Sequence, residues 1–245
     1  MRLYLAALLL ASTSIAPAQG WPDGFVSLDD YAPTVRVELH YATGNNFVGT
    51  PIDGYEAARP ILTRPAALAL RRAQAALERQ GYGLKLFDAY RPQRAVQHFI
   101  RWSQDASATA TKPTHYPDVP KTELFARAYL ALESAHSRGS AIDITLVRRT
   151  PDGTWQEQDL GTPVDFFGPE SRYDFAGLTA RQRANRQLLR ATLEEHGFTS
   201  YDQEWWHFTL RDEPYPDTYF DFRFNDPADC AAPGVTGRSG STNLD

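Results

Sequence analysis

The chain is poor in cysteine. Its 245 residues include one cysteine, Cys230, so no disulfide can form within the chain. A structural zinc site is closed by four ligands, usually several of them cysteines, and is excluded on the same ground. We expect Cys230 to be a buried or inert thiol; the alternative is a disulfide between two chains. The fold should then be stabilised by its apolar core, with bound metal as the one further source of stability.

The chain also lacks basic clusters and long apolar stretches. There is no lysine- or arginine-rich run and the formal net charge is −5, so nucleic acid is not an expected partner. The apolar run at residues 3–10 is too short to span a bilayer. Arg2 precedes this run, and a small-residue site ending at Ala18 follows it. This pattern predicts a secretory signal peptide at residues 1–18; the alternative is an uncleaved anchor.

The predicted signal has consequences for location. We expect export to the periplasm or the medium, with no stable membrane insertion after cleavage. No cysteine follows the apolar run directly, so a lipid anchor is not expected. The sequence makes no prediction of the oligomeric state.

The rest of the chain predicts one domain, residues 19–230, followed by a flexible tail at residues 231–245. Apolar periodicity and capping residues predict helices over residues 63–80, 92–103, 121–132 and 179–196, and strands over residues 35–39, 84–87, 141–147 and 205–210. Residues 41–55 predict a structured loop, and Thr63 is a candidate helix cap. Helices and strands do not alternate regularly, which favours an α+β domain with a central antiparallel sheet flanked by helices.

Two short segments carry side chains that suit a catalytic metal centre. His136 and Asp143 lie seven residues apart, and Gly139 between them favours the tight turn that would bring them together. His207 follows about 60 residues later. Two imidazole nitrogens and one carboxylate oxygen suit Zn²⁺, although other divalent ions accept such a set, and three ligands leave a position open for water. We predict one zinc ion per chain, bound on the sheet by these three residues.

A second carboxylate stands three residues before the last of these ligands. Glu204 can take a proton from water, and an apolar wall of Trp205 and Trp206 would raise its pKa toward a useful value. Each segment alone has a simpler interpretation, as a satisfied hydrogen bond or an interface motif. The remaining histidines, which lack a partner at ligand spacing, are predicted to be hydrogen-bonded or exposed: His40, His98, His115 and His196.

Together, the motifs resemble a known family. Five segments carry the resemblance: residues 41–51 (Tyr-Ala-Thr-Gly-Asn-Asn-Phe-x-Gly-x-Pro), 88–92 (Asp-Ala-Tyr-Arg-Pro), 134–143 (Ser-x-His-Ser-Arg-Gly-Ser-Ala-Ile-Asp), 161–167 (Gly-Thr-Pro-Val-Asp-Phe-Phe) and 204–208 (Glu-Trp-Trp-His-Phe). They resemble the zinc D,D-peptidases that share a fold with the hedgehog signalling domain, and more narrowly the D-Ala-D-Ala dipeptidases of the VanX type. The matches span roughly residues 35–210, in the family's order.

This resemblance implies an α+β zinc D,D-dipeptidase domain that hydrolyses a very short D,D-peptide. By motif, it implies zinc ligation by His136, Asp143 and His207, a base in Glu204, oxyanion stabilisation by Arg91, and Ser134 and Asp165 as candidates for holding the substrate's ammonium. The best-known family members act in the cytoplasm on newly made dipeptide. The predicted export signal instead favours scavenging or cell-wall turnover outside the cytoplasm.

Two alternatives stay open at this point. A D,D- or L,D-carboxypeptidase acting on longer peptidoglycan peptides would use the same metal site with a more open groove. A non-catalytic, zinc-stabilised binding module would need the metal ligands alone. Glu204 and Arg91 are both present, which favours an enzyme.

Overall fold

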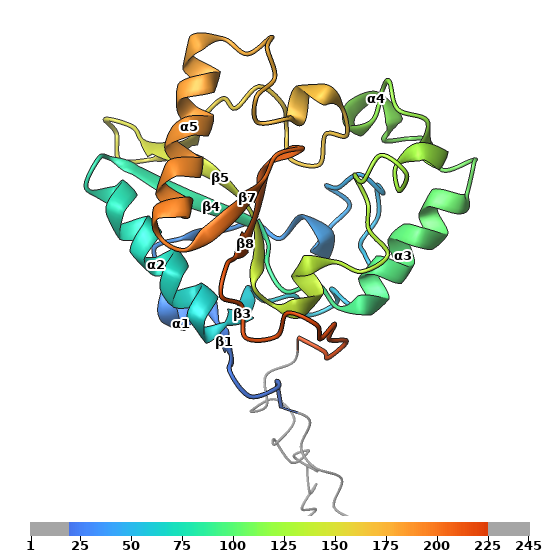
Figure 1. The fold of residues 1–245 in the computed structure, drawn as a ribbon, viewed down its shortest axis with the longest axis horizontal. Helices are drawn as coiled ribbons and strands as arrows, with labels where there is room; N and C mark the ends of the chain where they lie inside the picture. The colour runs from blue at the N-terminus through green and yellow to red at the C-terminus, as the bar shows by residue number, and fades with distance from the viewer. Residues whose placement is uncertain (1–19, 225–245) are drawn as a thin grey trace, which may run out of the picture. The chain divides into compact units, whose positions relative to one another are not determined.

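A mixed sheet of six strands organises the chain (Figure 1). The computed structural model describes residues 20–224, so the predicted signal peptide, the predicted tail and Cys230 lie outside the described residues. The strands are β2 (Arg36–Val37), β4 (Tyr82–Asp88), β5 (Ala141–Arg149), β6 (Trp155–Glu157), β7 (Phe198–Tyr201) and β8 (Glu204–Leu210). Their order is β2–β4–β5–β8–β7, with β6 paired to β5. All pairs are antiparallel except β2 with β4, which confirms the α+β class and the antiparallel centre of the sheet.

Helices lie on both sides of this sheet. Figure 1 places α1 (Leu28–Tyr31), α2 (Arg64–Glu78) and α5 (Ala180–Glu195) on one side, and α3 (Gln93–Gln104) and α4 (Lys112–His115) on the other. A separate two-stranded sheet pairs β1 (Phe25–Ser27) with β3 (Ile61–Thr63). Short 3-10 turns are η1 (His40–Ala42), η2 (Lys121–Glu123), η3 (Ala135–Arg138) and η4 (Pro169–Ser171). In residues 20–224, every helix is too short or too polar to cross a membrane.

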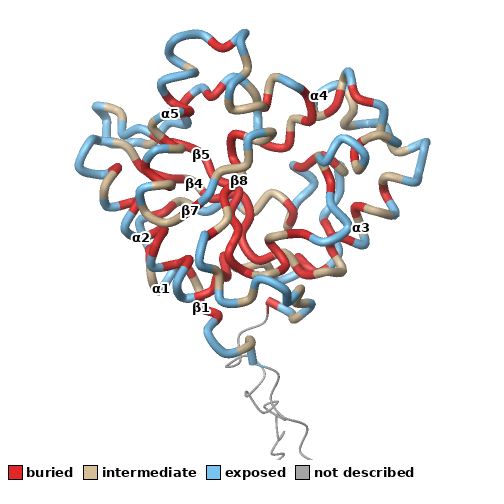
Figure 2. The backbone as a smooth tube through the Cα atoms, viewed as in Figure 1, coloured by how far each residue is buried: buried red, intermediate tan, exposed pale blue. Residues whose placement is uncertain are grey.

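The alternating side chains of β5 divide two cores. Ile142, Ile144 and Leu146 are fully buried in one apolar cluster with Leu70 of α2 and Leu189 of α5. Alternate residues of a strand point to opposite faces, so the side chains between them face the other way, toward the second core. Figure 2 shows the buried backbone concentrated in these central strands.

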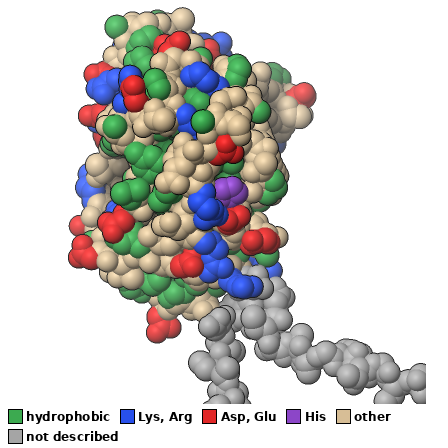
Figure 3. Space-filling view, turned by 90° about the vertical axis from the view of Figure 1, so that its right-hand side faces the viewer, with side chains coloured by type: hydrophobic (Ala, Val, Ile, Leu, Met, Phe, Trp, Pro, Cys, Tyr) green, Lys and Arg blue, Asp and Glu red, His purple; other side chains and the backbone are tan. Residues whose placement is uncertain are grey.

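The second core is aromatic. Phe47 lies at its centre, with ring centroids 4.8 Å from Phe99, 5.0 Å from Phe167 and 5.2 Å from Trp102. Such offset and edge-on ring pairs stabilise beyond the area that they bury. The cluster holds the loop at residues 41–55 in place, as predicted. On the surface over the α3 side, acidic and basic side chains are interspersed (Figure 3).

The predicted elements agree with the structure with one exception. Three of the four predicted helices, and all four predicted strands, agree within two residues at each end. Thr179 forms a capping box with Gln182 at the start of α5. Thr63 occupies the corresponding position before α2, but its hydroxyl makes no capping bond and pairs with Ser140 Oγ at 2.7 Å.

The helix predicted over residues 121–132 is wrong. After η2 the chain forms turns, and Ala128 adopts a left-handed φ of 60°. The backbone N–H groups of Tyr129 and Leu130 both donate to the Leu124 carbonyl, at 2.9 and 3.2 Å. In a continuous helix Leu124 and Leu130 would point to different sides, whereas the reversal buries both in the aromatic core. Tertiary packing therefore overrides local helix propensity here.

A substitution at Gly139 tests how tightly the turn after η3 is packed. Gly139 has φ +80°, and a Cβ there would lie 2.1 Å from Phe25 Cε1. Gly81 has φ +76°, but a Cβ added there would have no atom within 4 Å. We expect Gly81→Ala to lower the free energy of unfolding by about 1–2 kcal/mol through backbone strain. Gly139→Ala should cost about 1–3 kcal/mol more through overpacking. Equal losses in denaturant unfolding would contradict this packing.

Candidate active site

Three neighbouring strands place their functional residues in one row. Asp88 of β4 lies opposite Asp143 of β5, and Asp143 lies opposite His207 of β8. Directly opposed residues in antiparallel strands hold their Cβ atoms about 4.5–5.5 Å apart. The turn η3, immediately before β5, adds His136 to this row. Sheet register thus brings together residues far apart in the sequence.

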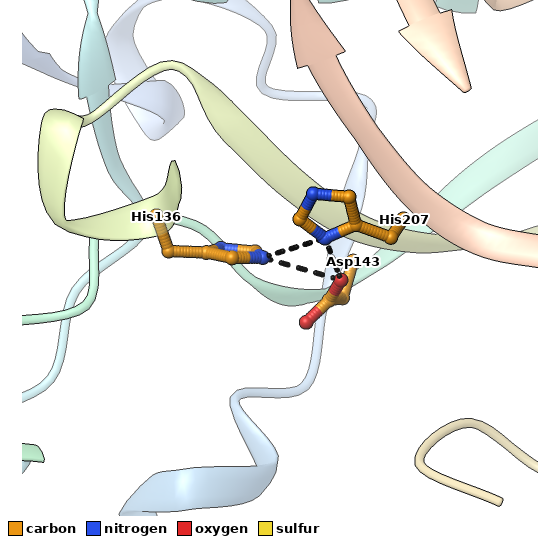
Figure 4. Close-up of side chains that lie close together, drawn as sticks. All are labelled: His136, Asp143 and His207. Atoms are coloured by element: carbon orange, nitrogen blue, oxygen red, sulfur yellow. Dashed lines mark hydrogen bonds and ion pairs between the residues drawn. The ribbon is translucent and has the colours of Figure 1, made fainter. Parts of the chain in front are cut away.

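His136, Asp143 and His207 converge on one point (Figure 4). His136 Nε2 is 3.1 Å from His207 Nδ1 and 3.3 Å from Asp143 Oδ1, and His207 Nδ1 is 3.1 Å from the same oxygen. Tetrahedral ligands about 2.0–2.1 Å from a zinc ion lie about 3.3–3.4 Å from one another. The three atoms therefore fit a divalent metal of this kind. Among residues 20–224 this is the one such group of histidine and acidic side chains.

Neighbouring acceptors fix which nitrogen of each histidine faces this point. His136 Nδ1 donates to the Ala89 carbonyl at 2.7 Å, which leaves its Nε2 lone pair toward the triad. His207 has the opposite orientation, because its Nε2 lies 3.3 Å from Thr209 Oγ1 and its Nδ1 faces the triad. Such partners orient a metal-binding imidazole and set its tautomer. Burial lowers the pKa of His207, which favours the neutral form that a metal requires.

Arg91 makes hydrogen bonds to both aspartates of the row formed by Asp88, Asp143 and His207. Its Nε donates to Asp88 Oδ2 at 2.9 Å, and its Nη2 donates to Asp143 Oδ2 at 3.2 Å. Asp88 also accepts from Tyr55 at 2.6 Å, so this buried carboxylate is fully engaged. The remaining Nη1 of Arg91 lies 3.5 Å from Ser134 Oγ. Asp88 and Asp143 thus hold the edge of the guanidinium formed by Nε and Nη2. Nη1 points toward Ser134.

A register shift places Glu204 beside His207. Residues three apart in a regular strand point to opposite faces. Between the pairs Ser200–Phe208 and Tyr201–Glu204 the register of β7 and β8 shifts, and the alternation is interrupted. As a result Glu204, Trp206 and His207 line one cavity. Trp205 lines a different cavity and donates to Thr162, so its predicted place in the wall beside Glu204 is wrong.

The electrostatic surroundings of Glu204 suit proton transfer. Burial raises its pKa well above the ordinary value of 4.5, the negative charges of Asp143 and Asp165 raise it further, and Arg91 opposes them. No hydrogen bond or ion pair engages its side chain within the described part of the chain, so the carboxylate is available to a ligand. A divalent cation at the triad would lower this pKa again.

Asp165 lines the same cavity. The Tyr41 hydroxyl donates to its two carboxylate oxygens, at 3.1 and 3.0 Å. Burial and the charge of Asp143 raise the pKa of Asp165 to about 7, against the opposing effects of Arg91 and Tyr41. An acidic group in this setting gains from a cationic ligand, which stabilises its charged form.

One cavity of about 630 Å³ unites these features. All seven side chains predicted from the sequence line it: Arg91, Ser134, His136, Asp143, Asp165, Glu204 and His207. Its remaining walls are largely apolar, with Phe125, Tyr129 and Leu130 from the segment after α4. A mostly apolar pocket with a few converging polar groups is typical of a small-molecule site.

Sequence reasoning missed several supporting residues. Asp88 and Tyr41 stand in motifs that were recognised, but no role was assigned to either. A buried acid at the end of a strand, three residues from an arginine, was an available signal for Asp88. Thr209 and the Ala89 carbonyl carry no sequence signal, because their contacts depend on strand register.

Fold and site define a class. A triad that could hold a divalent metal, a free carboxylate and a guanidinium in one cavity are typical parts of a metal-dependent hydrolase. Comparison with known proteins narrows this class. A model of the D-Ala-D-Ala dipeptidase family matches residues 22–225. The chain therefore belongs to this family, a family of peptidases, as its motifs suggested.

Individual relatives match this chain over most of their length. The D-alanyl-D-alanine dipeptidase of Enterococcus faecium is 43% identical over 199 residues, 81% of this chain and 97% of the relative. That of Streptomyces coelicolor is 44% identical over 198 residues, 81% of this chain and 96% of the relative. A dipeptidase of the same name from Escherichia coli is 32% identical over 178 residues, 73% of this chain and 80% of the relative.

The hydrogen bond between His207 and Thr209 gives a test of the metal centre. Thr209→Val keeps the shape of the side chain but removes the acceptor for His207 Nε2–H. We expect it to weaken zinc affinity by about 10–100-fold, the usual cost of losing such a partner. Thr199→Val is the control, because Thr199 pairs opposite Thr209 on β7 and is exposed. Competition with a chromophoric chelator measures both, and equal affinities would exclude this role for Thr209.

Proposed function

We propose that this protein is an exported zinc D-Ala-D-Ala dipeptidase, which hydrolyses the free dipeptide to D-alanine. The observation that carries the proposal is the convergence of all seven predicted side chains on one cavity. The relatives of the same family carry that dipeptidase activity in their names. Export is proposed from the sequence alone, on Arg2, the apolar run at residues 3–10 and the small-residue site ending at Ala18.

Glu204 would move the proton in this reaction. A zinc ion held by His136, Asp143 and His207 would polarise the peptide carbonyl and lower the pKa of the attacking water. The carboxylate of Glu204, free of other partners in the described structure, would accept a proton from that water. It would then pass the proton to the nitrogen of the leaving D-alanine, as a general base that becomes a general acid.

Arg91 would stabilise the developing negative charge. Its Nε and Nη2 are held by Asp88 and Asp143, so the cation is fixed in place before substrate binds. A preorganised charge of this kind acts mainly on the transition state, because no reorganisation is needed during the reaction. The same contact with Asp143 also orients a proposed metal ligand.

Different side chains would hold the ammonium and the carboxylate of the dipeptide. The carboxylate of Asp165 suits the substrate's ammonium. Ser134, the other candidate for the ammonium, already accepts from the His136 N–H at 3.3 Å and lies within 3.5 Å of Arg91 Nη1. Its own O–H remains to donate, which suits the substrate's carboxylate. A longer or blocked peptide would leave a buried charge unpaired, so selectivity for a free dipeptide follows.

Glu204→Gln tests the proton-transfer role. We expect the variant to retain one zinc per chain, since Glu204 is outside the triad, and to lose about 10²–10⁴-fold in kcat. Metal analysis and steady-state kinetics on D-Ala-D-Ala measure the two effects. Activity near that of the wild type would remove Glu204 from the mechanism.

The raised pKa of Glu204 sets a pH dependence. The base must be ionised, so kcat/KM should fall as the pH drops through its pKa in the free enzyme. The negative charge of Asp165 raises that pKa whether or not a cation occupies the triad, so Asp165→Asn should move the acid limb to lower pH. Circular dichroism over the same range separates this loss from unfolding. An acid limb at the same pH in folded Asp165→Asn and wild-type protein would contradict the proposal.

A substrate comparison separates the proposed function from its alternatives. The chain from residue 19 onward is incubated with D-Ala-D-Ala or with a pentapeptide ending in D-Ala-D-Ala, each with and without a chelator. We expect chelator-sensitive cleavage of the dipeptide alone. Cleavage of the pentapeptide instead would assign a carboxypeptidase, and no cleavage of either would favour a zinc-stabilised binding module.

A further inference from the structure

Residues 162–167 form a wall between two cavities. On one side, Asp165 and Phe167 line the cavity of the metal triad. On the other side, residues 162–164 line a second cavity of about 250 Å³, together with His40, His115 and Thr145. Asp165 is therefore presented to the active site by a segment that has a cavity behind residues 162–164, although its end at Phe167 packs in the aromatic core.

His115 holds this wall at two points. Its Nδ1 lies 3.1 Å from the backbone oxygen of Asp165, and its own carbonyl accepts from the Phe167 N–H at 2.6 Å. A carbonyl oxygen can only accept, so the proton of the imidazole is on Nδ1. His115 is the last residue of the short helix α4, which comes from a distant part of the chain.

The conformation of Asp165 explains why such support is needed. Asp165 has φ +59°, one of two non-glycine residues with a left-handed backbone among residues 20–224. This conformation is unfavourable for a residue with a Cβ and persists only where surrounding contacts enforce it. The contacts that enforce it are the two from His115 and the hydrogen bonds from Tyr41 to the carboxylate.

We propose that His115 is a positioning residue that fixes Asp165 for the ammonium group of the substrate. The inference rests on the proposed dipeptidase function, in which Asp165 meets that ammonium. His115 lines the second cavity and not that of the triad, so it would act through the backbone of Asp165. Its loss should weaken substrate binding in the ground state and the transition state alike, which raises KM and leaves kcat nearly unchanged.

Isosteric substitutions separate this role from simple packing. The amide nitrogen of asparagine can occupy the place of Nδ1, whereas that of glutamine reaches only the place of Nε2. We expect His115→Ala and His115→Gln to raise KM for D-Ala-D-Ala about tenfold with kcat within about twofold, the loss of roughly one hydrogen bond. His115→Asn should restore KM to within about twofold of the wild type. His40→Ala, which alters the second cavity without touching Asp165, is the matched control and should leave KM unchanged.

The effect should also depend on Asp165. In an Asp165→Asn background, His115→Ala should add little to KM, because the charge that it positions is already gone. An unchanged KM in His115→Ala, an equal rise in His115→Asn, or an undiminished effect in the Asp165→Asn background would each overturn the proposal.

A crystal structure of His115→Ala and His115→Asn adds a readout independent of turnover. We expect the contact between Tyr41 and the Asp165 carboxylate to be lost in the first and kept in the second. The same contact in both would overturn the positioning role. If the wild type fails to cleave D-Ala-D-Ala, the proposed function fails, and these two structures still decide whether His115 positions Asp165.

Discussion

The register of β4, β5 and β8 is the constraint on which the site depends. It sets Asp88, Asp143 and His207 side by side across three strands. A slip of one residue in either pair would turn a ligand to the opposite face of the sheet. The buried side chains of Ile142 and Ile144 resist such a slip, because it would move them out of the apolar core. The core that stabilises the fold therefore also determines the geometry of the triad.

Charge balance links the triad to the rest of the cavity. The acidic groups Asp88, Asp143, Asp165 and Glu204 lie around the guanidinium of Arg91. Burial and mutual repulsion raise the pKa of Asp165 and Glu204, so these surroundings favour positive ligands. A divalent ion and a substrate ammonium are the two cations that the proposed reaction would bring. The same excess of carboxylates thus accounts for both binding steps in the proposal.

The candidate site residues were easier to predict from the sequence than the residues that position them. His136, Asp143, His207 and Glu204 were candidates because few residue types bind metal or transfer protons, and because they fall in two short segments. The direction of Trp205 was not predictable, because it depends on a register shift between β7 and β8. His115 was interpreted as merely hydrogen-bonded or exposed, since its partner is a backbone oxygen 50 residues away.

Local helix propensity predicted the helices correctly where the helix also buries an apolar face. The long helices α2, α3 and α5 form as predicted, because each has an apolar face with a core to cover. Residues 121–132 have the composition of a helix but turn back instead, so that Leu124 and Leu130 both reach the aromatic core. The burial of both leucines depends on tertiary structure, so it leaves no periodic signal in the sequence.

The most direct test of the metal centre is a crystal structure of the zinc-loaded protein with anomalous scattering recorded at the zinc edge. We expect one peak per chain, about 2.0–2.2 Å from His136 Nε2, His207 Nδ1 and an Asp143 carboxylate oxygen. A peak at other residues, or coordination through His207 Nε2, would contradict the site described here.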